Sequence, residues 1–236
     1  GLSHRYQNYY LFRNLNFSLE TGSVLVVKGA NGAGKSTLIK ILTGGMEAIS
    51  GKVSFRLNES EIPHDNLWKM MAMVAPYQEL PEELTLRELI DFQIKIDSKS
   101  LKWQDFLEVA EPLKMTSHLD KLISDYSTGM KQKAKVISAL GLKRPILFLD
   151  EPTVGVDVQS RNVIIEHLKN INEEGTTIIY TSHHMEEAEH FCHRVSIIDH
   201  GRILTHGTPA ELIENTPGAD NLEKVFLHLT KRKLRD

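Results

Sequence analysis

The stretch GANGAGKST, at positions 29–37, has the residue types and spacing of a loop that binds phosphate. It fits the pattern G-x-x-x-x-G-K-[ST], with Gly29, Gly34, Lys35 and Ser36 at the defining positions. The apolar run VLVV precedes it and a helical pattern follows, which is the context that this motif requires and a chance glycine turn lacks. Backbone N–H groups can approach phosphate oxygens where no Cβ intervenes. The sequence therefore predicts that Lys35 reaches the β- and γ-phosphates of a nucleotide and that Ser36 ligates Mg²⁺.

Two adjacent carboxylates, Asp150 and Glu151, follow the apolar run ILFL at 146–149. In open α/β sheets ligands bind at the carboxyl ends of the strands, so we expect Asp150 to hold Mg²⁺. Successive side chains near a strand end point in different directions. Glu151 can therefore face the γ-phosphate and accept a proton from attacking water, a role typically worth about 10²–10⁴-fold in rate.

A third segment, YSTGMKQK at 126–133, is predicted to begin a helix. Ser127 is a suitable N-cap, and apolar residues recur after it at helical spacing: Met130, Ala134, Ile137 and Leu140. Gly129 lies in the first turn, where it leaves the backbone accessible. A helix start of this kind favours anions, although the neighbouring sequence offers no ligand for it.

The elements that must position these residues alternate between strands and helices. The runs ILFLD, TIIYTS and VSIID are continuously apolar, as parallel strands covered on both faces are. A helix at about 158–172 is predicted between the first two, with an inward stripe of Val163, Ile164, Leu168 and Ile171. KVSFRL, at 52–57, alternates Val53, Phe55 and Leu57 and predicts an antiparallel strand. The fold class is α/β, with a mainly parallel core sheet and an N-terminal antiparallel β part.

Strand signals vanish between about 85 and 142, where helical patterns follow one another. We interpret this as a helical subdomain inserted into one domain that spans 1–236, with the core at 1–84 and 143–215. A C-terminal helix is predicted at about 216–236. Its basic end is interpreted as a solvated terminus, with contact to anionic lipid as the lesser alternative.

Composition excludes several classes of protein. A net charge of −3 gives no indication of a nucleic-acid surface, and the single cysteine, Cys192, excludes an internal disulfide. The densest apolar runs are four residues long, whereas a membrane helix needs roughly 20. If the protein serves a membrane, another chain or region must therefore cross it. No signal peptide is visible. The sequence begins at Gly1 rather than Met, so whether a further edge strand precedes Leu2 stays an open question.

Together these motifs resemble the ATP-binding cassette (ABC) ATPase family over nearly the whole chain. In this resemblance GANGAGKST is the Walker A motif, ILFLDEP is Walker B, and YSTGMKQK stands for the signature LSGGQ. Gln78 in APYQELP corresponds to the Q-loop glutamine, and VGVD at 154–157 to the D-loop. His183 corresponds to the switch histidine, and Tyr6 to the aromatic that stacks on adenine, with Tyr9 and Tyr10 as the nearest alternatives.

The resemblance implies that two cassettes pack head to tail around two ATP molecules. Ser127 and Gly129 would then grip the γ-phosphate of an ATP held by the other subunit. The signature departs from LSGGQ at Tyr126, Thr128 and Met130, and such variants resemble those of exporters of the drug-resistance and polysaccharide or lipid type.

The expected site follows residue by residue. Catalysis is assigned to Glu151, His183 and Lys35, and Mg²⁺ to Ser36, Gln78 and Asp150. Nucleotide contacts are assigned to Tyr6, Gly29, Asn31, Gly32, Ala33, Gly34, Lys35, Ser36, Thr37, Gln78, Ser127 and Gly129. The expected partners are a second ATP-binding subunit, in the first instance another copy of this chain, and an integral membrane permease that docks beside roughly 79–97, but no nucleic acid. The expected location is cytoplasmic, on the cytoplasmic face of the cell membrane.

Three alternative interpretations agree less well with the sequence. A soluble ABC ATPase acting on ribosomes or DNA usually has two cassettes or a long coiled-coil insertion, and this chain has one cassette and no heptad tract. A P-loop kinase or GTPase would leave Gln78, His183 and the signature segment without a role. A zinc site in HFCHR, at 190–194, fits no common ligand spacing.

Overall fold

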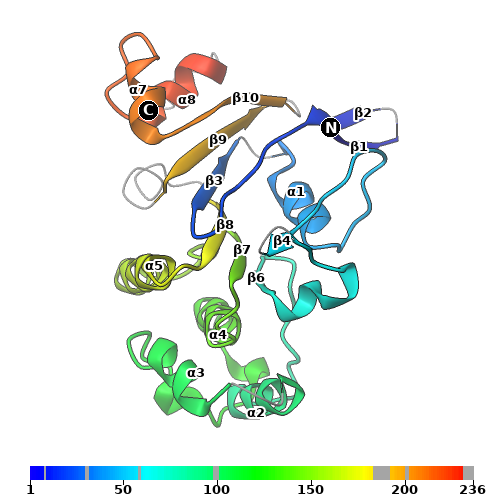
Figure 1. The fold of residues 1–236 in the computed structure, drawn as a ribbon. Helices are drawn as coiled ribbons and strands as arrows, with labels where there is room; N and C mark the ends of the chain where they lie inside the picture. The colour runs from blue at the N-terminus through cyan, green and yellow to red at the C-terminus, as the bar shows by residue number, and fades with distance from the viewer. Residues whose placement is uncertain are drawn as a thin grey trace.

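A computed structural model describes residues 1–7, 9–29, 32–57, 60–97, 101–182, 192–199 and 202–230. Its centre is a six-stranded sheet in the order β10-β9-β3-β8-β7-β6 (Figure 1). The strands are β3 (Val24–Lys28), β6 (Met71–Val74), β7 (Ile146–Asp150), β8 (Thr177–Thr181), β9 (Arg194–Asp199) and β10 (Arg202–Gly207). All neighbours pair in parallel except β10, which is antiparallel to β9. The predicted parallel core is confirmed.

Alternate side chains of the sheet enter two different hydrophobic clusters. Val24 and Val26 of β3 belong to one cluster, and Leu25 and Val27 to the other. This alternation follows from the two-residue period of a strand and leaves both faces of the sheet buried. It explains why the parallel strands have continuously apolar sequences.

One face of the sheet is covered by helix α1 (Lys35–Leu42), which lies against the second cluster through Leu38, Ile39 and Leu42. Strands β1 (Leu2–Tyr6) and β2 (Tyr9–Leu15) form the separate antiparallel sheet that was predicted near the N-terminus. Phe12 of β2 is fully buried in the same cluster. The start of α1 is therefore fixed between the two sheets.

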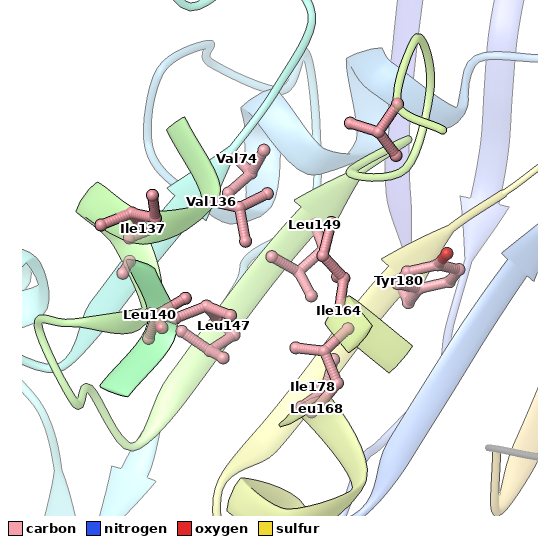
Figure 2. Close-up of a cluster of buried hydrophobic side chains, with 14 of the residues drawn as sticks. Val74, Val136, Ile137, Leu140, Leu147, Leu149, Ile164, Leu168, Ile178 and Tyr180 are labelled. Atoms are coloured by element: carbon pink, nitrogen blue, oxygen red, sulfur yellow. The ribbon is translucent and has the colours of Figure 1, made fainter. Parts of the chain in front are cut away.

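The opposite face carries α4 (Thr128–Leu140) and α5 (Val158–Glu173). Figure 2 shows their apolar side chains meeting those of β7 and β8, and the labelled residues are Val74, Val136, Ile137, Leu140, Leu147, Leu149, Ile164, Leu168, Ile178 and Tyr180. Burying one such side chain fully contributes about 1.5–3 kcal/mol, so this packing fixes both helices on the sheet. The helix predicted at 158–172 and the helix capped by Ser127 are confirmed.

The region at 85–142 is helical. It contains α2 (Leu86–Asp97), α3 (Trp103–Ala110) and α4, with short 3₁₀ turns at Thr116–His118 and Ile123–Asp125. Helices α2 and α3 lie at one end of the molecule, with α4 between them and the sheet (Figure 1). Two helices follow β10, α7 (Pro209–Glu214) and α8 (Leu222–Thr230). The basic residues after 230 lie outside the described residues.

The strand predicted at 52–57 is wrong over most of its length. Only β4 (Arg56–Leu57) is a strand, paired with β5 (Ser60–Glu61). Val53 and Phe55 pack against the second cluster, where the Phe55 ring meets Phe148 edge-on. Their alternation therefore reflects burial of side chains without the ladder of hydrogen bonds that defines a strand. In the part of the chain that the structure describes, no helix has the length and apolar character needed to cross a membrane.

Candidate nucleotide-binding site

The loop between β3 and α1 is shaped by two glycines. Gly34 has a φ of 97°, and a Cβ there would lie 2.8 Å from side-chain atoms of Leu11 and Phe12. A Cβ on Gly29 would lie 2.4 Å from the carbonyl oxygen of Ile198. Both positions exclude larger residues on steric grounds, because a Cβ there would collide with neighbouring parts of the chain.

Lys35 begins α1 and is buried. Its ammonium donates to the carbonyl of Gly29 at 2.8 Å and so bridges the two ends of the loop. Burial lowers the pKa of Lys35, while the nearby charges of Glu151 and Asp150 raise it. The cation, the two carboxylates and the loop therefore occupy one site.

Asp150 ends β7 and is fully buried. Its Oδ1 accepts a hydrogen bond from the Thr181 hydroxyl at 2.5 Å, and its Oδ2 has no hydrogen-bond partner. The side-chain oxygen of Gln78 is likewise buried without a partner. A buried oxygen atom without a hydrogen-bond partner lowers the stability of the fold unless a cation or a hydrogen-bond donor binds it. Oxygen ligands of this type fit Mg²⁺.

Mg²⁺ is usually held by one or two carboxylates together with substrate phosphates, not by a cage of protein ligands. Among the described residues, no group of three or more His, Cys, Asp or Glu side chains could hold a metal. The zinc alternative gains no support within this part of the chain. His193 instead accepts the backbone N–H of Val24 at 3.2 Å, and Cys192 packs against the first cluster.

Glu151 has a φ of 52°, a left-handed conformation that non-glycine residues rarely adopt. Its backbone N–H donates to the carbonyl oxygen of Thr181 at 3.1 Å and to the hydroxyl oxygen of Thr181 at 3.2 Å. The strained backbone turns the chain immediately after Asp150. Such strain is concentrated at functional sites.

Tyr6 lies beside the phosphate loop and is half exposed. Its hydroxyl is 3.3 Å from the hydroxyl of Thr37 in α1, and its ring meets the His4 ring edge-on at 5.1 Å. Of the alternative aromatics, Tyr10 has its ring covered by the Arg13 guanidinium at 4.2 Å. The Tyr6 ring thus lies next to the loop, while the side chain of the other alternative, Tyr9, lies outside the described part of the structure.

The start of α4 contains the other predicted phosphate contacts. The exposed Ser127 caps the helix by accepting the N–H of Met130 at 3.3 Å. A Cβ on Gly129 would lie 2.9 Å from the carbonyl oxygen of Gly155. Close packing against Gly155 therefore accounts for a glycine at position 129 without any ligand. Met130 itself packs partly against the first cluster.

The predicted nucleotide contacts divide between two places. Gly29, Gly32, Ala33, Gly34, Ser36 and Thr37 lie in the loop and the first turn of α1. Within the described residues, the contacts of Ser127 and Gly129 run within α4 and to Gly155. Asn31 and His183 lie outside the described residues.

Sequence reasoning missed Thr181 and Gln132. Gln132 is buried in α4 and donates to the carbonyls of Pro152, at 2.9 Å, and Glu151, at 3.4 Å. The sequence does show a hydroxyl, that of Thr181, at the carboxyl end of an apolar run. It does not show that this hydroxyl bonds Asp150, which is 31 residues away in the chain. The side chains that orient the two carboxylates therefore come from elements distant in sequence.

The sequence at 12–154 matches the family described as ABC transporter. The chain belongs to this family, and it is an ABC ATPase. Linearmycin resistance ATP-binding protein LnrL of Bacillus subtilis is 35% identical over 210 residues, covering 88% of this chain and 68% of that protein. Nod factor export ATP-binding protein I of Rhizobium sp. is 32% identical over 226 residues, covering 94% and 74%.

Solved structures agree with this assignment. An ATP-binding subunit of an ABC transporter has a TM-score of 0.86 at 25% identity, covering 97% of both chains. A dimeric ATP-binding cassette in a post-hydrolysis state with ADP and Pi has a TM-score of 0.75 at 22% identity, covering 88% of this chain and 96% of that one. The second comparison shows the fold alone.

Proposed function

We propose that this chain is the ATP-hydrolysing subunit of an ABC exporter, which pairs with a second cassette around two ATP molecules and drives a separate membrane subunit. The observation that carries the hydrolysis is the buried Asp150 at the end of β7, whose Oδ2 has no hydrogen-bond partner, together with the buried Lys35 that bridges the phosphate loop. Export is supported by the relatives named for linearmycin resistance and Nod factor export.

Lys35 and the loop amides hold the phosphates of ATP, and the Tyr6 ring stacks on adenine. Ser36, Gln78 and the Oδ2 of Asp150 would hold Mg²⁺, which would neutralise charge on the phosphate oxygens. Glu151 accepts a proton from water as that water attacks the γ-phosphorus. The bond to the bridging oxygen breaks, and ADP and phosphate result. His183 contacts the departing phosphate.

Dimerisation follows from the two separate groups of phosphate contacts. Ser127 and Gly129 would bind the γ-phosphate of an ATP held by the partner, because their contacts among the described residues run to α4 and Gly155. ATP favours the closed pair only through contacts that it makes on both sides, and hydrolysis removes them.

The proposed permease docks beside 79–97, at the cytoplasmic face of the cell membrane. Phe92 and Ile96, one turn apart on α2, are 57% and 52% exposed. Exposed apolar side chains grouped on one helix are typical of an interaction surface. An apolar helix of the membrane subunit suits this face.

The test is Glu151→Gln in the full chain, assayed for ATP hydrolysis, ATP binding and ATP-dependent dimerisation. The variant should lose about 10²-fold or more in rate, keep ATP binding and accumulate as a closed dimer. Undiminished hydrolysis would refute the role of Glu151. Ser127→Arg should bind ATP as a monomer without dimerising, and normal dimerisation would contradict the shared site.

A further inference from the structure

A lysine of the signature helix reaches the turn that carries Gln78. The ammonium of Lys135 donates to the carbonyl oxygens of Ala75, at 3.3 Å, and Pro76, at 3.2 Å. Ala75 is fully buried directly after β6, and the lysine is 60 residues away in the chain. The contact therefore joins α4 to the carboxyl end of β6, the edge strand of the central sheet.

The same carbonyl of Ala75 also accepts the N–H of Gln78 at 3.1 Å. This bond closes the turn. The Lys135 ammonium and the backbone N–H of Gln78 therefore share one acceptor, the carbonyl oxygen of Ala75. The pKa of Lys135 is lowered by burial and raised by the Glu79 charge. Hydrogen bonds from a charged donor are stronger than those from a neutral one, so the ammonium holds the turn more firmly than a neutral donor would.

The opposite side of this turn is held by α1. The ring of Tyr77, between Pro76 and Gln78, lies 4.0 Å from the Lys40 ammonium, and its hydroxyl lies 3.7 Å from the sulfur of Met73. The turn is thus held between the phosphate-loop helix and the signature helix. The free side-chain oxygen of Gln78 is presented from that position.

We propose that Lys135 is a positioning residue that makes the placement of Gln78 at this chain's own ATP site depend on the placement of the signature helix. The inference rests on the proposed function, since it uses Gln78 as an Mg²⁺ ligand and Ser127 as a contact to the partner's ATP. Through Lys135, movement of α4 toward a partner is transmitted to Gln78. The coupling is reciprocal, because Mg²⁺ held by Gln78 then favours one placement of α4.

Lys131 provides a matched control one turn earlier on α4. It forms an ion pair with Glu82, whose side chain is 58% exposed. Surface ion pairs of this kind contribute little to stability. Lys131→Met therefore removes the same charge from the same helix without releasing the turn.

The experiment measures ATPase activity of the full chain against Mg²⁺ concentration, with the melting temperature alongside. Lys135→Met should raise the Mg²⁺ concentration for half-maximal activity about tenfold, and Lys131→Met should leave it within about twofold. Lys135→Arg keeps a cationic donor and should restore most of the loss. An effect no larger than that of Lys131→Met would overturn the proposal.

A double-mutant cycle with Gln78→Ala distinguishes positioning from general destabilisation. If Lys135 acts through Gln78, Lys135→Met should add no further shift in Mg²⁺ dependence to the Gln78→Ala variant. Full additivity would overturn the inference. Failure of the proposed function is recognised separately, because the unmodified chain would then show no Mg²⁺-dependent ATP hydrolysis. Should Lys135→Met fail to fold, Lys135→Gln serves in the same cycle.

Discussion

The hydroxyl of Thr181 lies 2.5 Å from Oδ1 of Asp150 and also accepts the N–H of Glu151 at 3.2 Å. One side chain of β8 thereby orients both carboxylate residues at the end of β7. The bond occupies one oxygen of Asp150 and leaves Oδ2 for a cation. The register of the sheet places Thr181 directly opposite Asp150.

Thr181→Val should therefore reduce activity although the site keeps its shape. The buried Oδ1 of Asp150 loses its donor, at a cost of about 1–3 kcal/mol in the free energy of unfolding. Loss of a group that orients a metal ligand typically costs about 10–100-fold in metal affinity or activity. Steady-state ATPase assays and urea unfolding measure the two effects. Thr181→Ser keeps the hydroxyl and should stay near the unmodified protein, and equal losses in both variants would contradict this reasoning.

Gly129→Ala tests the close approach between the signature and the D-loop. The new Cβ would lie 2.9 Å from the Gly155 carbonyl, so either α4 or the segment after Glu151 must move. ATP-dependent dimerisation, measured by analytical ultracentrifugation, should weaken about tenfold or more because the overpacking costs about 1–3 kcal/mol. ATP binding to the monomer should change little. Unaltered dimerisation would contradict this prediction, because it would show that the backbone at Gly155 moves away from the new Cβ without weakening the dimer.

Asp157 makes two separable kinds of contact, a cap within α5 and an ion pair with α4. Its carboxylate caps α5 by accepting the N–H and the hydroxyl of Ser160, at 2.8 Å and 2.7 Å, and it pairs with Lys133 at 3.0 Å. Together these contacts hold the pKa of Asp157 well below its usual range. Asp157→Ala should lower the free energy of unfolding, whereas Asp157→Asn keeps the cap and should lower it less.

The same pair of variants tests the ion pair itself. Lys133→Met should resemble Asp157→Asn in thermal stability, because both changes remove the pair and leave the cap. If Asp157→Asn proves as unstable as Asp157→Ala, the stability comes from charge and not from capping. Differential scanning calorimetry of the three variants provides the comparison.

His167 on α5 is expected to make the protein sensitive to mild acid. Burial lowers its pKa below the model-compound value of 6.5, assisted by the Lys143 charge and opposed by Glu108 and Glu174. Because its pKa is lower in the folded state, its contribution is complete above about pH 6.5 and is lost as the pH falls.

The urea midpoint should therefore drop between about pH 7.5 and about pH 5.5, and His167→Gln should reduce the size of that drop. His228→Gln, a change at an exposed position of α8, is the control and should leave the drop unaltered. Equal slopes in all three proteins would contradict the assignment to His167.

Much of the fold was predictable because its signals are local. The phosphate loop, the helix start at Ser127 and the apolar strands each depend on residues within one short stretch, and the structure has them where they were expected. The prediction of a strand at 52–57 was wrong because the alternation of apolar residues there reflects only the burial of their side chains. A local pattern does not reveal whether a second strand is present to pair with it by hydrogen bonds.

The sequence alone determined the family, the order of the elements and the residue types at each motif, since these are read along the chain. Only the tertiary structure decided that Thr181 orients Asp150, that Gly129 meets Gly155 and that Lys135 holds the turn before Gln78. These contacts join elements far apart in sequence. Their geometry is fixed by the packing of α4 and α5 on the sheet (Figure 2), which no stretch of sequence specifies by itself.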